Sequence, residues 1–512
     1  MTIKISFNSF IFNALISFSI YKHITMKSKF QVILIMLLFN LPIMAQLKVG
    51  VAESIITPPN PIGVKMAGYD RGSNTSTGVH DDLFARALVV EAEDGTSSAM
   101  ITVAVVNMSE AVMDQIRSGV NKETGIPFKN VIVSSTHTHS GPVMGPPEDA
   151  YIKFFISQTV RSASDAWKSR VIGKIGVGST EVFGMALNDR RMEYGGLPSD
   201  PEAAVIKVED ASGKLMGVFF NYSCHPSVLD LHNLKFTEDW PFFTIKGIKE
   251  TLPKGVIVGY FQSAQGDSKA GYLAELSAVG AYMQGIRSFE FAEKKGRVLA
   301  EAVLKVIPTI LTSSNISVKV AYDKFKVPRR TTFPISHAEA LSWQERAKAT
   351  LAEKEKLVLY YPKDQEGMDK LQQAARELYA KGDPGKYIGP RTLDKFKVDL
   401  WLATQAVGQS KMIEALPPNP APFMLPMQAI RLGNTVFVTF PAEVFSDIGV
   451  SVKNQSPFQN TFIFGVAGGY NGYIGSAAEF LEGGYAINGS PYAPQAEKII
   501  IDASLELINR VK

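Results

Sequence analysis

Cysteine is almost absent from this chain of 512 residues, because Cys224 is the only one. A single thiol cannot form a disulfide within the chain, and it cannot supply a multi-cysteine zinc or iron–sulfur site. Internal repeats and low-complexity tracts are also lacking. With 46% hydrophobic and 20% charged residues, the composition excludes a disordered, collagen-like or coiled-coil protein and indicates a folded domain of enzyme size.

The chain has no excess of basic or acidic residues outside its first 45 positions. The formal net charge of +4 comes from 53 basic and 49 acidic residues. Four of the basic residues lie in the first 45 positions, which contain no Asp or Glu: Lys4, Lys22, Lys27 and Lys29. The rest of the chain therefore carries 49 residues of each sign. Bulk charge gives no support for a nucleic acid or an anionic membrane as partner.

The N-terminal segment has the features of an export signal. A short basic stretch at 26–29 precedes a mostly apolar run at 30–41, and Ala45 offers a small residue for cleavage. We expect a signal peptide that starts at Met26, and residues 1–25 are either an upstream extension or a membrane anchor. The apolar run is shorter than the roughly 20 residues of a membrane-spanning helix. We therefore expect a periplasmic or secreted protein with no stable membrane span after cleavage.

Six apolar, β-branched runs each end in a turn that carries a polar side chain. They lie at 99–106, 130–135, 218–222, 256–261, 435–440 and 461–466. Helical spacing of apolar residues predicts helices among them, at 110–120, 147–169, 291–306 and 495–511. In an open α/β sheet, ligands bind outside the carboxyl ends of the strands. The sequence therefore predicts an α/β fold in which six strand ends converge on one pocket.

Residues 336–410 differ in composition, being richer in Ala, Lys, Glu and Gln. Helical stretches are predicted at 336–358 and 363–381, with breaks at Pro384-Gly385 and Gly389-Pro390. The region is either a cover beside the pocket or a structural helix pair. We expect residues 46–512 to form one catalytic domain with this helical insertion.

The segment Thr136-His137-Thr138-His139-Ser140-Gly141-Pro142 carries the strongest chemical signal. If the preceding strand extends into it, the period of two places His137 and His139 on one side, where both could face a metal or a substrate. The alternative is a polar turn whose imidazoles bond to the backbone. His225, which also follows a strand, would by itself more often be a core histidine than a ligand.

Three further polar residues follow predicted strands. Glu443 could be a hard metal ligand, a general base or the first residue of a helix. Tyr473 could approach a cation or simply pack, and Asp267 could cap a helix or orient a histidine. A catalytic zinc site needs about four nitrogen or oxygen donors with one position open for water. The combination with the histidines could supply such a site.

In order and spacing, these segments resemble the neutral ceramidases and their bacterial relatives over residues 47–495. The landmarks are 49–52 with 56–58, 78–83 with 85–87, 136–142, 221–225, 262–267, 440–443, and Asn471-Gly472-Tyr473 followed twelve residues later by Tyr485. The resemblance implies a large α/β catalytic domain of layered β-sheets flanked by helices, and a bound Zn²⁺.

The resemblance also implies roles for individual residues. The zinc ligands would be His137, His225, Glu443 and Tyr473. His139 would be the acid/base residue, and Arg190 and Tyr485 would polarise the substrate carbonyl. His80 and Asp267 would be supporting positions around the pocket.

The chain departs from the family pattern at three places. Gly266-Asp267-Ser268-Lys269 stands where ceramidases have Gly-Asp-Val-Ser, so the family's serine is missing or displaced to Ser268. Asp189-Arg190-Arg191 replaces the usual Asn-Arg. The chain also stops soon after the catalytic region, so we expect no C-terminal immunoglobulin-like domain. A metal-activated water does not require the serine, whereas ceramide as the substrate is an open question.

We therefore expect a secreted zinc-dependent hydrolase that cleaves an N-acyl bond in a lipid or an acylated sugar. One alternative keeps the zinc but cleaves an ester or glycosidic bond of an extracellular glycan. Another is a binding protein with a structural zinc site. A lipid site predicts a deep apolar groove, and a glycan site predicts an open cleft with exposed aromatic residues. Candidate stacking residues, which could equally pack between helices, are Trp343, Trp401, Tyr360 and Tyr361.

Overall fold

The computed structural model describes residues 47–191, 198, 200–281, 286–358, 365–382 and 390–512. The expected signal peptide, Tyr360, Tyr361 and the break at Pro384-Gly385 lie outside these residues. Contacts gather Leu47–Lys512 into one compact unit. None of the helices within the described part of the chain is both long and apolar enough to cross a membrane.

Eight strands form a mixed sheet in the order β11-β9-β8-β6-β1-β3-β4-β5. They are β1 (Lys48–Ile55), β3 (Phe84–Glu91), β4 (Ser97–Val103), β5 (Val131–Ser135), β6 (Val171–Glu181), β8 (Glu202–Asp210), β9 (Leu215–Tyr222) and β11 (Ile257–Gln262). The pairs β4·β5 and β9·β11 are parallel, and the remaining pairs are antiparallel.

A second sheet of four strands packs against one face of the first. Its order is β13 (Val318–Val327), β14 (Phe423–Leu432), β15 (Thr435–Thr439) and β17 (Asn460–Phe464), with β15 and β17 parallel. Side chains alternate along each strand, so that Leu88 of β3 joins the core between the sheets while its neighbour Val89 faces helices. The rings of Phe261 and Phe464 stack across the interface with centroids 4.3 Å apart.

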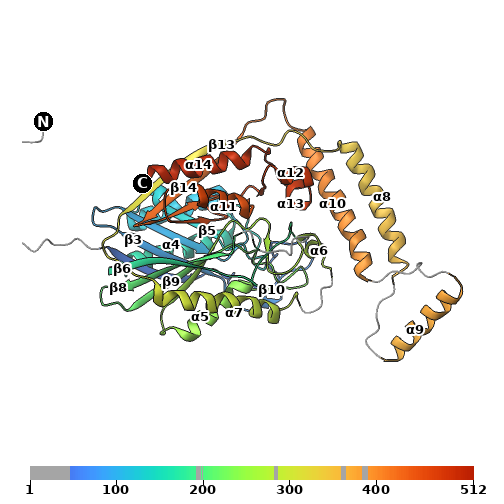
Figure 1. Cartoon of the computed structure of the whole chain (residues 1–512), viewed down its shortest axis with the longest axis horizontal. Helices are drawn as coiled ribbons and strands as arrows, with labels where there is room; N and C mark the ends of the chain where they lie inside the picture. The colour runs from blue at the N-terminus through green and yellow to red at the C-terminus, as the bar shows by residue number, and fades with distance from the viewer. Residues whose placement is uncertain (1–46, 192–197, 199, 282–285, 359–364, 383–389) are drawn as a thin grey trace, which may run out of the picture. The chain divides into compact units, whose positions relative to one another are not determined.

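Helices cover the outer faces of both sheets, which gives four layers (Figure 1). The large sheet is covered by α3 (Glu110–Thr124), α4 (Ala150–Lys168), α5 (Trp240–Thr251) and α7 (Phe289–Val306). The small sheet is covered by α11 (Ser446–Gln455) and α14 (Ala496–Arg510). Local signals fix the ends of α3, since Ser109 accepts from the amide of Val112 and Gly125 ends the helix with φ 78°.

The predicted α/β class with layered sheets is confirmed, and all six apolar runs contain strands of the two sheets. The six strands are divided between the two sheets: the first four belong to the large sheet, and β15 and β17 belong to the small one. Both sheets are covered on both faces, so their strands have the same continuous apolar pattern.

The helical insertion lies between the antiparallel neighbours β13 and β14. Its helices are α8 (His337–Glu355), α9 (Gln365–Ala380) and α10 (Pro390–Glu414). A capping box of Ser336 and Glu339 begins α8, and the indole of Trp343 donates to Asp399 of α10 at 3.0 Å. Helix α10 was not predicted from the sequence as a separate helix. This helix contacts α6 (Ala274–Ala278) and α13 (Tyr485–Asn488), so the insertion stands beside the site described below.

Short elements complete the described fold. Three two-stranded pairs are β2 (Gly78–Val79) with β10 (Lys235–Phe236), β7 (Leu187–Asn188) with β12 (Ser268–Lys269), and β16 (Glu443–Val444) with β18 (Tyr473–Ile474). The helix α12 (Glu479–Glu482) precedes α13.

Candidate metal centre

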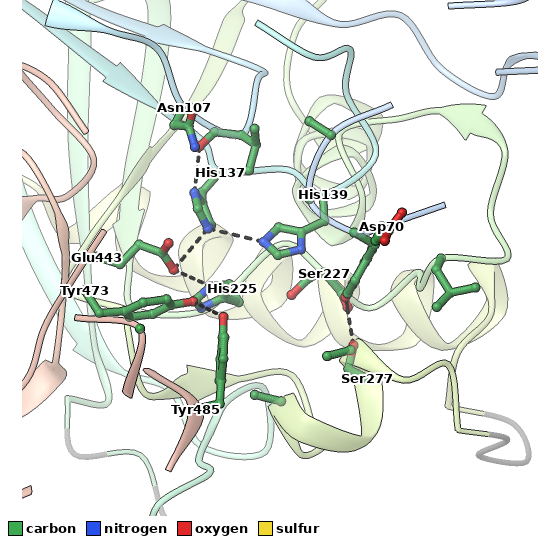
Figure 2. Close-up of a pocket in the computed structure, with 18 of the residues that line it drawn as sticks. Asp70, Asn107, His137, His139, His225, Ser227, Ser277, Glu443, Tyr473 and Tyr485 are labelled. Atoms are coloured by element: carbon green, nitrogen blue, oxygen red, sulfur yellow. Dashed lines mark hydrogen bonds and ion pairs between the residues drawn. The ribbon is translucent and has the colours of Figure 1, made fainter. Parts of the chain in front are cut away.

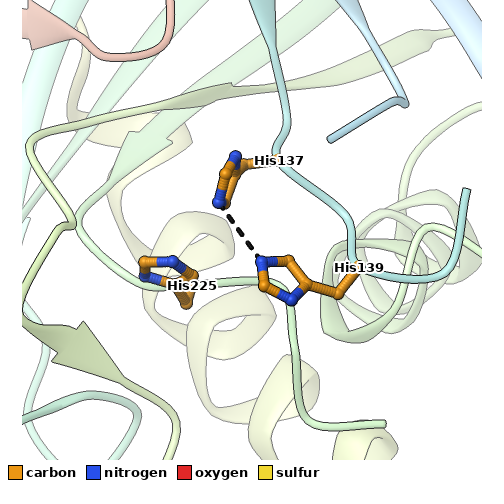
Figure 3. Close-up of side chains that lie close together, drawn as sticks. All are labelled: His137, His139 and His225. Atoms are coloured by element: carbon orange, nitrogen blue, oxygen red, sulfur yellow. Dashed lines mark hydrogen bonds between the residues drawn. The ribbon is translucent and has the colours of Figure 1, made fainter. Parts of the chain in front are cut away.

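His137 and His139 meet at the carboxyl end of β5, but not because the strand extends. β5 ends at Ser135, and His137 has a positive φ of 70°. The left-handed turn nevertheless brings the two Nε2 atoms to 3.2 Å of each other (Figure 3). The backbone amides of the two residues are held by Val105 and Pro226. The prediction that both histidines face one point therefore agrees with the structure, although its reason, the period of a strand, is wrong.

His225 approaches the same point from the end of β9. Its amide donates to Ser268 O at 2.9 Å, and its carbonyl accepts from the indole of Trp240. The Nδ1 atom of His225 lies 2.9 Å from Gln265 O, and Nδ1 of His137 lies 2.6 Å from Val106 O. A ring nitrogen that faces a carbonyl oxygen must carry the proton. Both imidazoles therefore turn an unprotonated Nε2 toward the centre of the site.

Glu443 completes this convergence. The parallel register of β16 and β18 pairs Glu443 directly with Tyr473. One carboxylate oxygen of Glu443, Oε2, lies 3.2 Å from Nε2 of His137 and 2.9 Å from Nε2 of His225, as Figure 2 shows. The other oxygen accepts from the phenol of Tyr470 at 2.6 Å. Two nitrogen lone pairs and an anionic oxygen thus face one another in a buried space, an arrangement that a cation would stabilise.

The protonation states of the histidines are those that binding a cation requires. Burial lowers the pKa of His225 to about 3, with the nearby Lys269 acting in the same direction. Burial also lowers the pKa of His139 well below its ordinary value, and His137 and His225 add to the effect. At neutral pH these rings are uncharged and can act as ligands. The ring nitrogens of His137, His139 and His225 lie within 4.8 Å of one another, close enough for all three to hold a metal.

Tyr473 and Tyr485 form the opposite wall. Their hydroxyl oxygens are 2.5 Å apart, and the ring of Trp401 lies against Tyr485 with centroids 4.9 Å apart. Burial raises the pKa of both phenols well above its ordinary value, so both keep their protons at neutral pH. Both residues therefore lie at the site as neutral phenols, each able to donate a hydrogen bond.

The structure does not place Arg190 on the wall of the cavity. Its guanidinium forms an ion pair with Glu479 of α12 and donates to Gly483 O at 2.8 Å. Arg191 pairs with the same carboxylate at 2.5 Å. Glu479, which is distant in sequence and almost fully buried, pairs with both guanidinium groups, and the expected role of Arg190 in polarising a carbonyl stays a prediction.

His80 and Asp267 also lie away from the cavity. His80 bonds to Asp81 at 2.6 Å and stacks on Phe289 with centroids 4.0 Å apart, and its expected supporting position around the pocket stays a prediction. Asp267 accepts from the amide and hydroxyl of Ser446, at 2.8 Å each, at the start of α11. Asp267 therefore holds in place the loop whose Gln265 carbonyl contacts Nδ1 of His225.

The site opens into a cavity of about 930 Å³. Helix α10 contributes Trp401, Thr404, Gln405 and Gln409 to its wall. Tyr470 and Lys269, which were not predicted as site residues, also line the cavity. Tyr470 directly precedes Asn471-Gly472-Tyr473, and Lys269 lies two residues after Asp267, but only the folded loops turn their side chains inward. The displaced Ser268 does not line the cavity, and its hydroxyl donates to Ser223 O.

Comparisons with known proteins agree on one family. The profile for neutral/alkaline non-lysosomal ceramidase, N-terminal, matches residues 47–240. Neutral ceramidases of Drosophila melanogaster and Drosophila pseudoobscura pseudoobscura are 27% identical over 221 residues, which cover 38% of this chain and 31% of theirs. The neutral ceramidase of Pseudomonas aeruginosa is 22% identical over 493 residues, which cover 88% of this chain and 70% of that protein.

Solved structures extend the likeness to the fold. The crystal structure of neutral ceramidase from Pseudomonas aeruginosa matches with a TM-score of 0.66 at 19% identity, over 91% of this chain and 75% of that one. A ceramidase complexed with C2 matches with a TM-score of 0.63 at 17% identity, over 91% of this chain and 76% of that one. The chain is thus similar to neutral/alkaline non-lysosomal ceramidases in sequence over residues 47–240, and in fold over most of its length.

Proposed function

We propose that this chain is a zinc-dependent hydrolase that cleaves an N-acyl bond in a ceramide-like compound. The observation that carries the proposal is the meeting of Glu443 Oε2 with the Nε2 atoms of His137 and His225, at 3.2 and 2.9 Å, in a buried space. Glu443 Oε2 has no hydrogen-bond donor among the described residues. A buried carboxylate oxygen without a donor is costly unless a cation neutralises it.

The donor set fits zinc. Zinc takes nitrogen and oxygen ligands in fourfold coordination, and a catalytic site keeps one position open. His137, His225 and Glu443 would hold the ion, with Tyr473 or His139 beside them. Backbone carbonyls fix the tautomers of both histidines, as they do in other zinc sites. When bound, zinc would lower the pKa of a water molecule toward about 7 and polarise a carbonyl oxygen.

The residues of the chain supply the remaining steps. His139 is uncharged at neutral pH, and its buried Nδ1 has no hydrogen-bond partner within the described part of the chain. His139 can therefore take the proton of the attacking water and deliver it to the leaving amine, a role worth roughly 10² to 10⁴ in rate. The neutral phenol of Tyr485 can donate to the oxyanion, where one fixed donor is worth about 3 to 4 kcal/mol.

The substrate class is inferred from the family and from the cavity. The relatives are neutral ceramidases, and one similar structure is a ceramidase complexed with C2. A second candidate, a bond in an extracellular glycan, is favoured by the polar side chains of Thr404, Gln405 and Gln409 beside Trp401 on the wall. The leader-like segment at 26–45 supports export to the periplasm or beyond.

Metal analysis and hydrolysis assays test the proposal together. The purified protein should contain about one zinc per chain and should hydrolyse ceramide, or an N-acetylated sugar, before but not after chelation. His225→Ala should lose both zinc and activity. His139→Ala should keep zinc and lose about 10² to 10⁴ in kcat. The exposed His232 provides the matched control, because His232→Ala should keep both.

Two results would contradict the assignment. Full activity in His225→Ala would remove this histidine from the ligands. If His139→Ala lost zinc as completely as His137→Ala, His139 would be a ligand rather than an acid/base residue. Activity that survives complete removal of zinc would end the metal-dependent proposal.

A further inference from the structure

Tyr470 bonds to the oxygen of Glu443 that does not meet the imidazoles. Its hydroxyl donates to Oε1 of Glu443 at 2.6 Å. Oε2 of the same carboxylate lies 3.2 Å from Nε2 of His137 and 2.9 Å from Nε2 of His225 (Figure 2). The side chain of Tyr470 is half-buried and lines the cavity. The two oxygens of Glu443 are thus engaged on different sides, one by a phenol and one by the pair of imidazoles.

The orientation of the Glu443 carboxyl group depends on this bond. Glu443 is 2% exposed, so water does not hold its oxygens in place. Within the described part of the chain, the hydroxyl of Tyr470 is the one hydrogen-bond donor to this carboxylate. Rotation about χ3 of a glutamate is only weakly restricted, so its carboxyl group keeps one orientation only where a bond fixes it. Removal of the hydroxyl would leave the carboxyl group free to turn.

The loop between β17 and β18 holds Tyr470 at this place. Its two ends are bonded to the segment that leads into Glu443: the amide of Ala467 donates to Phe440 O at 2.9 Å, and Gly472 O accepts from the amide of Glu443 at 3.0 Å. Gly472 has a φ of 86°, a conformation that glycine adopts without strain. Backbone hydrogen bonds on both sides of Tyr470 therefore position the phenol before any ion or substrate binds.

We propose that Tyr470 is a positioning residue, which fixes Glu443 so that a single oxygen, Oε2, is presented to the zinc ion. A carboxylate can bind a cation through one oxygen or through both. The second oxygen would take the position that a catalytic zinc site keeps open for water. Because Oε1 is engaged by Tyr470, the bond favours binding through Oε2 alone. This inference rests on the metal site of the proposed function and assigns a further residue to it.

The experiment measures zinc affinity, by competition between the zinc-free protein and a chelating dye. Tyr470→Phe removes the hydroxyl and keeps the ring. Tyr492→Phe is the matched control, because the hydroxyl of Tyr492, buried in the core of the small sheet, has no hydrogen-bond partner among the described residues. Glu443→Gln and the double variant with Tyr470→Phe complete a double-mutant cycle. Circular dichroism checks that each zinc-free variant is folded, and visible absorption is recorded for Co²⁺-loaded wild type and Tyr470→Phe.

Tyr470→Phe should bind zinc about 10- to 100-fold more weakly than the wild type, which is the usual effect of losing a hydrogen bond to a metal ligand. In the Glu443→Gln background the same change should alter the zinc Kd by no more than about twofold, because Tyr470 then has no carboxylate to orient. Tyr492→Phe should keep the wild-type Kd. Co²⁺ absorbs visible light less strongly as its coordination number rises, so Co²⁺-loaded Tyr470→Phe should absorb less than the wild type.

Failure of this inference and failure of the proposed function give different results. If Glu443→Gln weakens zinc binding but Tyr470→Phe does not, the metal site stands and the role of Tyr470 is wrong. An equal loss of affinity with and without the Glu443 carboxylate would also overturn the inference, since Tyr470 would then act independently of it. Unchanged Co²⁺ absorption would contradict the presentation of a single oxygen. If the wild type binds no zinc, or Glu443→Gln binds it as tightly, the proposed metal centre fails and the inference fails with it.

Discussion

Backbone strain is concentrated around the candidate metal centre. Among the described residues, three that are not glycine have a positive φ: His137, Asp239 and Val466. Val466 follows β17, and its carbonyl accepts from the amide of Ser135, immediately before the His137 turn. Such conformations cost of order 1–3 kcal/mol each and persist where the surroundings enforce them. Here they turn the ends of β5 and β17 toward each other, and the imidazole of His137 turns inward as a result.

Asp189 gives a prediction about pH and stability. Burial raises the pKa of its carboxyl to about 7, although the nearby Lys269 acts in the opposite direction. Because this folded-state pKa lies above the unfolded value of about 3.9, the folded chain binds more protons between these pH values. Stability contributed by Asp189 is therefore lost as pH rises from about 4 to 7.

Replacing the carboxyl should reverse this loss. Asp189→Asn should leave Tm near that of the wild type at pH 4 and stabilise the fold by roughly 1–3 kcal/mol at pH 8, measured by calorimetry across the range. The exposed Asp502 is the control, because Asp502→Asn should change stability by no more than about 0.5 kcal/mol at either pH. Parallel pH profiles for wild type and Asp189→Asn would contradict a raised pKa.

The residues of the candidate site could be predicted from the sequence where a polar side chain follows an apolar run. The structure brings His137, His139, His225, Glu443 and Tyr473 to one cavity, together with Tyr485, and the sequence signal was a polar residue after an apolar run. The ion pair of Arg190 with Glu479 was not predictable, because the two residues are remote in sequence and no local pattern reveals the pair. Lys269 was passed over for a similar reason, since only the folded loop shows that its ammonium is buried.

Helix α10 forms part of the cavity wall, in addition to the residues that follow the strands. It lies against the site through Trp401 on Tyr485, and the amide of Gln409 donates to Gly489 O at 3.4 Å. The insertion was predicted to be either a cover beside the pocket or a structural helix pair, and α10 has features of both. One face packs on α8, and the other lines the cavity.

A substitution in α10 tests whether the helix contacts substrate. Trp401→Ala removes the ring beside Tyr485 and should raise KM about three- to tenfold, with zinc content unchanged, because an aromatic contact is worth about 0.5–1.5 kcal/mol. Trp343→Phe is the control in the same helix pair. It removes only the bond to Asp399 and should lower Tm slightly without changing KM. A wild-type KM in Trp401→Ala would make the insertion a structural element only.

The elements were more predictable than their arrangement. Apolar runs and helical spacing located the six strands and the helices α3, α4, α7 and α14. The division of the strands between two sheets was not predictable from these runs, because a strand buried under a helix and one buried under a second sheet are equally apolar. The strand pairing between β16 and β18, which sets Glu443 beside Tyr473, involves two residues on each side and leaves no periodic signal.

The candidate ligands come from separate parts of the whole molecule. His137 follows β5, and His225 follows β9, within the large sheet, whereas Glu443 lies in β16 after a strand of the small sheet. A bound ion would therefore tie the two sheets together at one edge. An unfolded chain cannot present these side chains together, so any metal affinity of the folded state adds to its stability.

Zinc should accordingly raise the Tm of this chain in a concentration-dependent manner. At free zinc a hundredfold above Kd, the added stability is about 2.7 kcal/mol, which calorimetry with and without a chelator can measure. Glu443→Gln keeps the shape of the side chain but removes the negative charge between the two imidazoles, so its Tm should respond little to zinc. Asp70→Asn, at the rim of the same cavity, should respond as the wild type does. An equal zinc response in Glu443→Gln would mean that the ion binds elsewhere, and the two sheets would then be held by their apolar core alone.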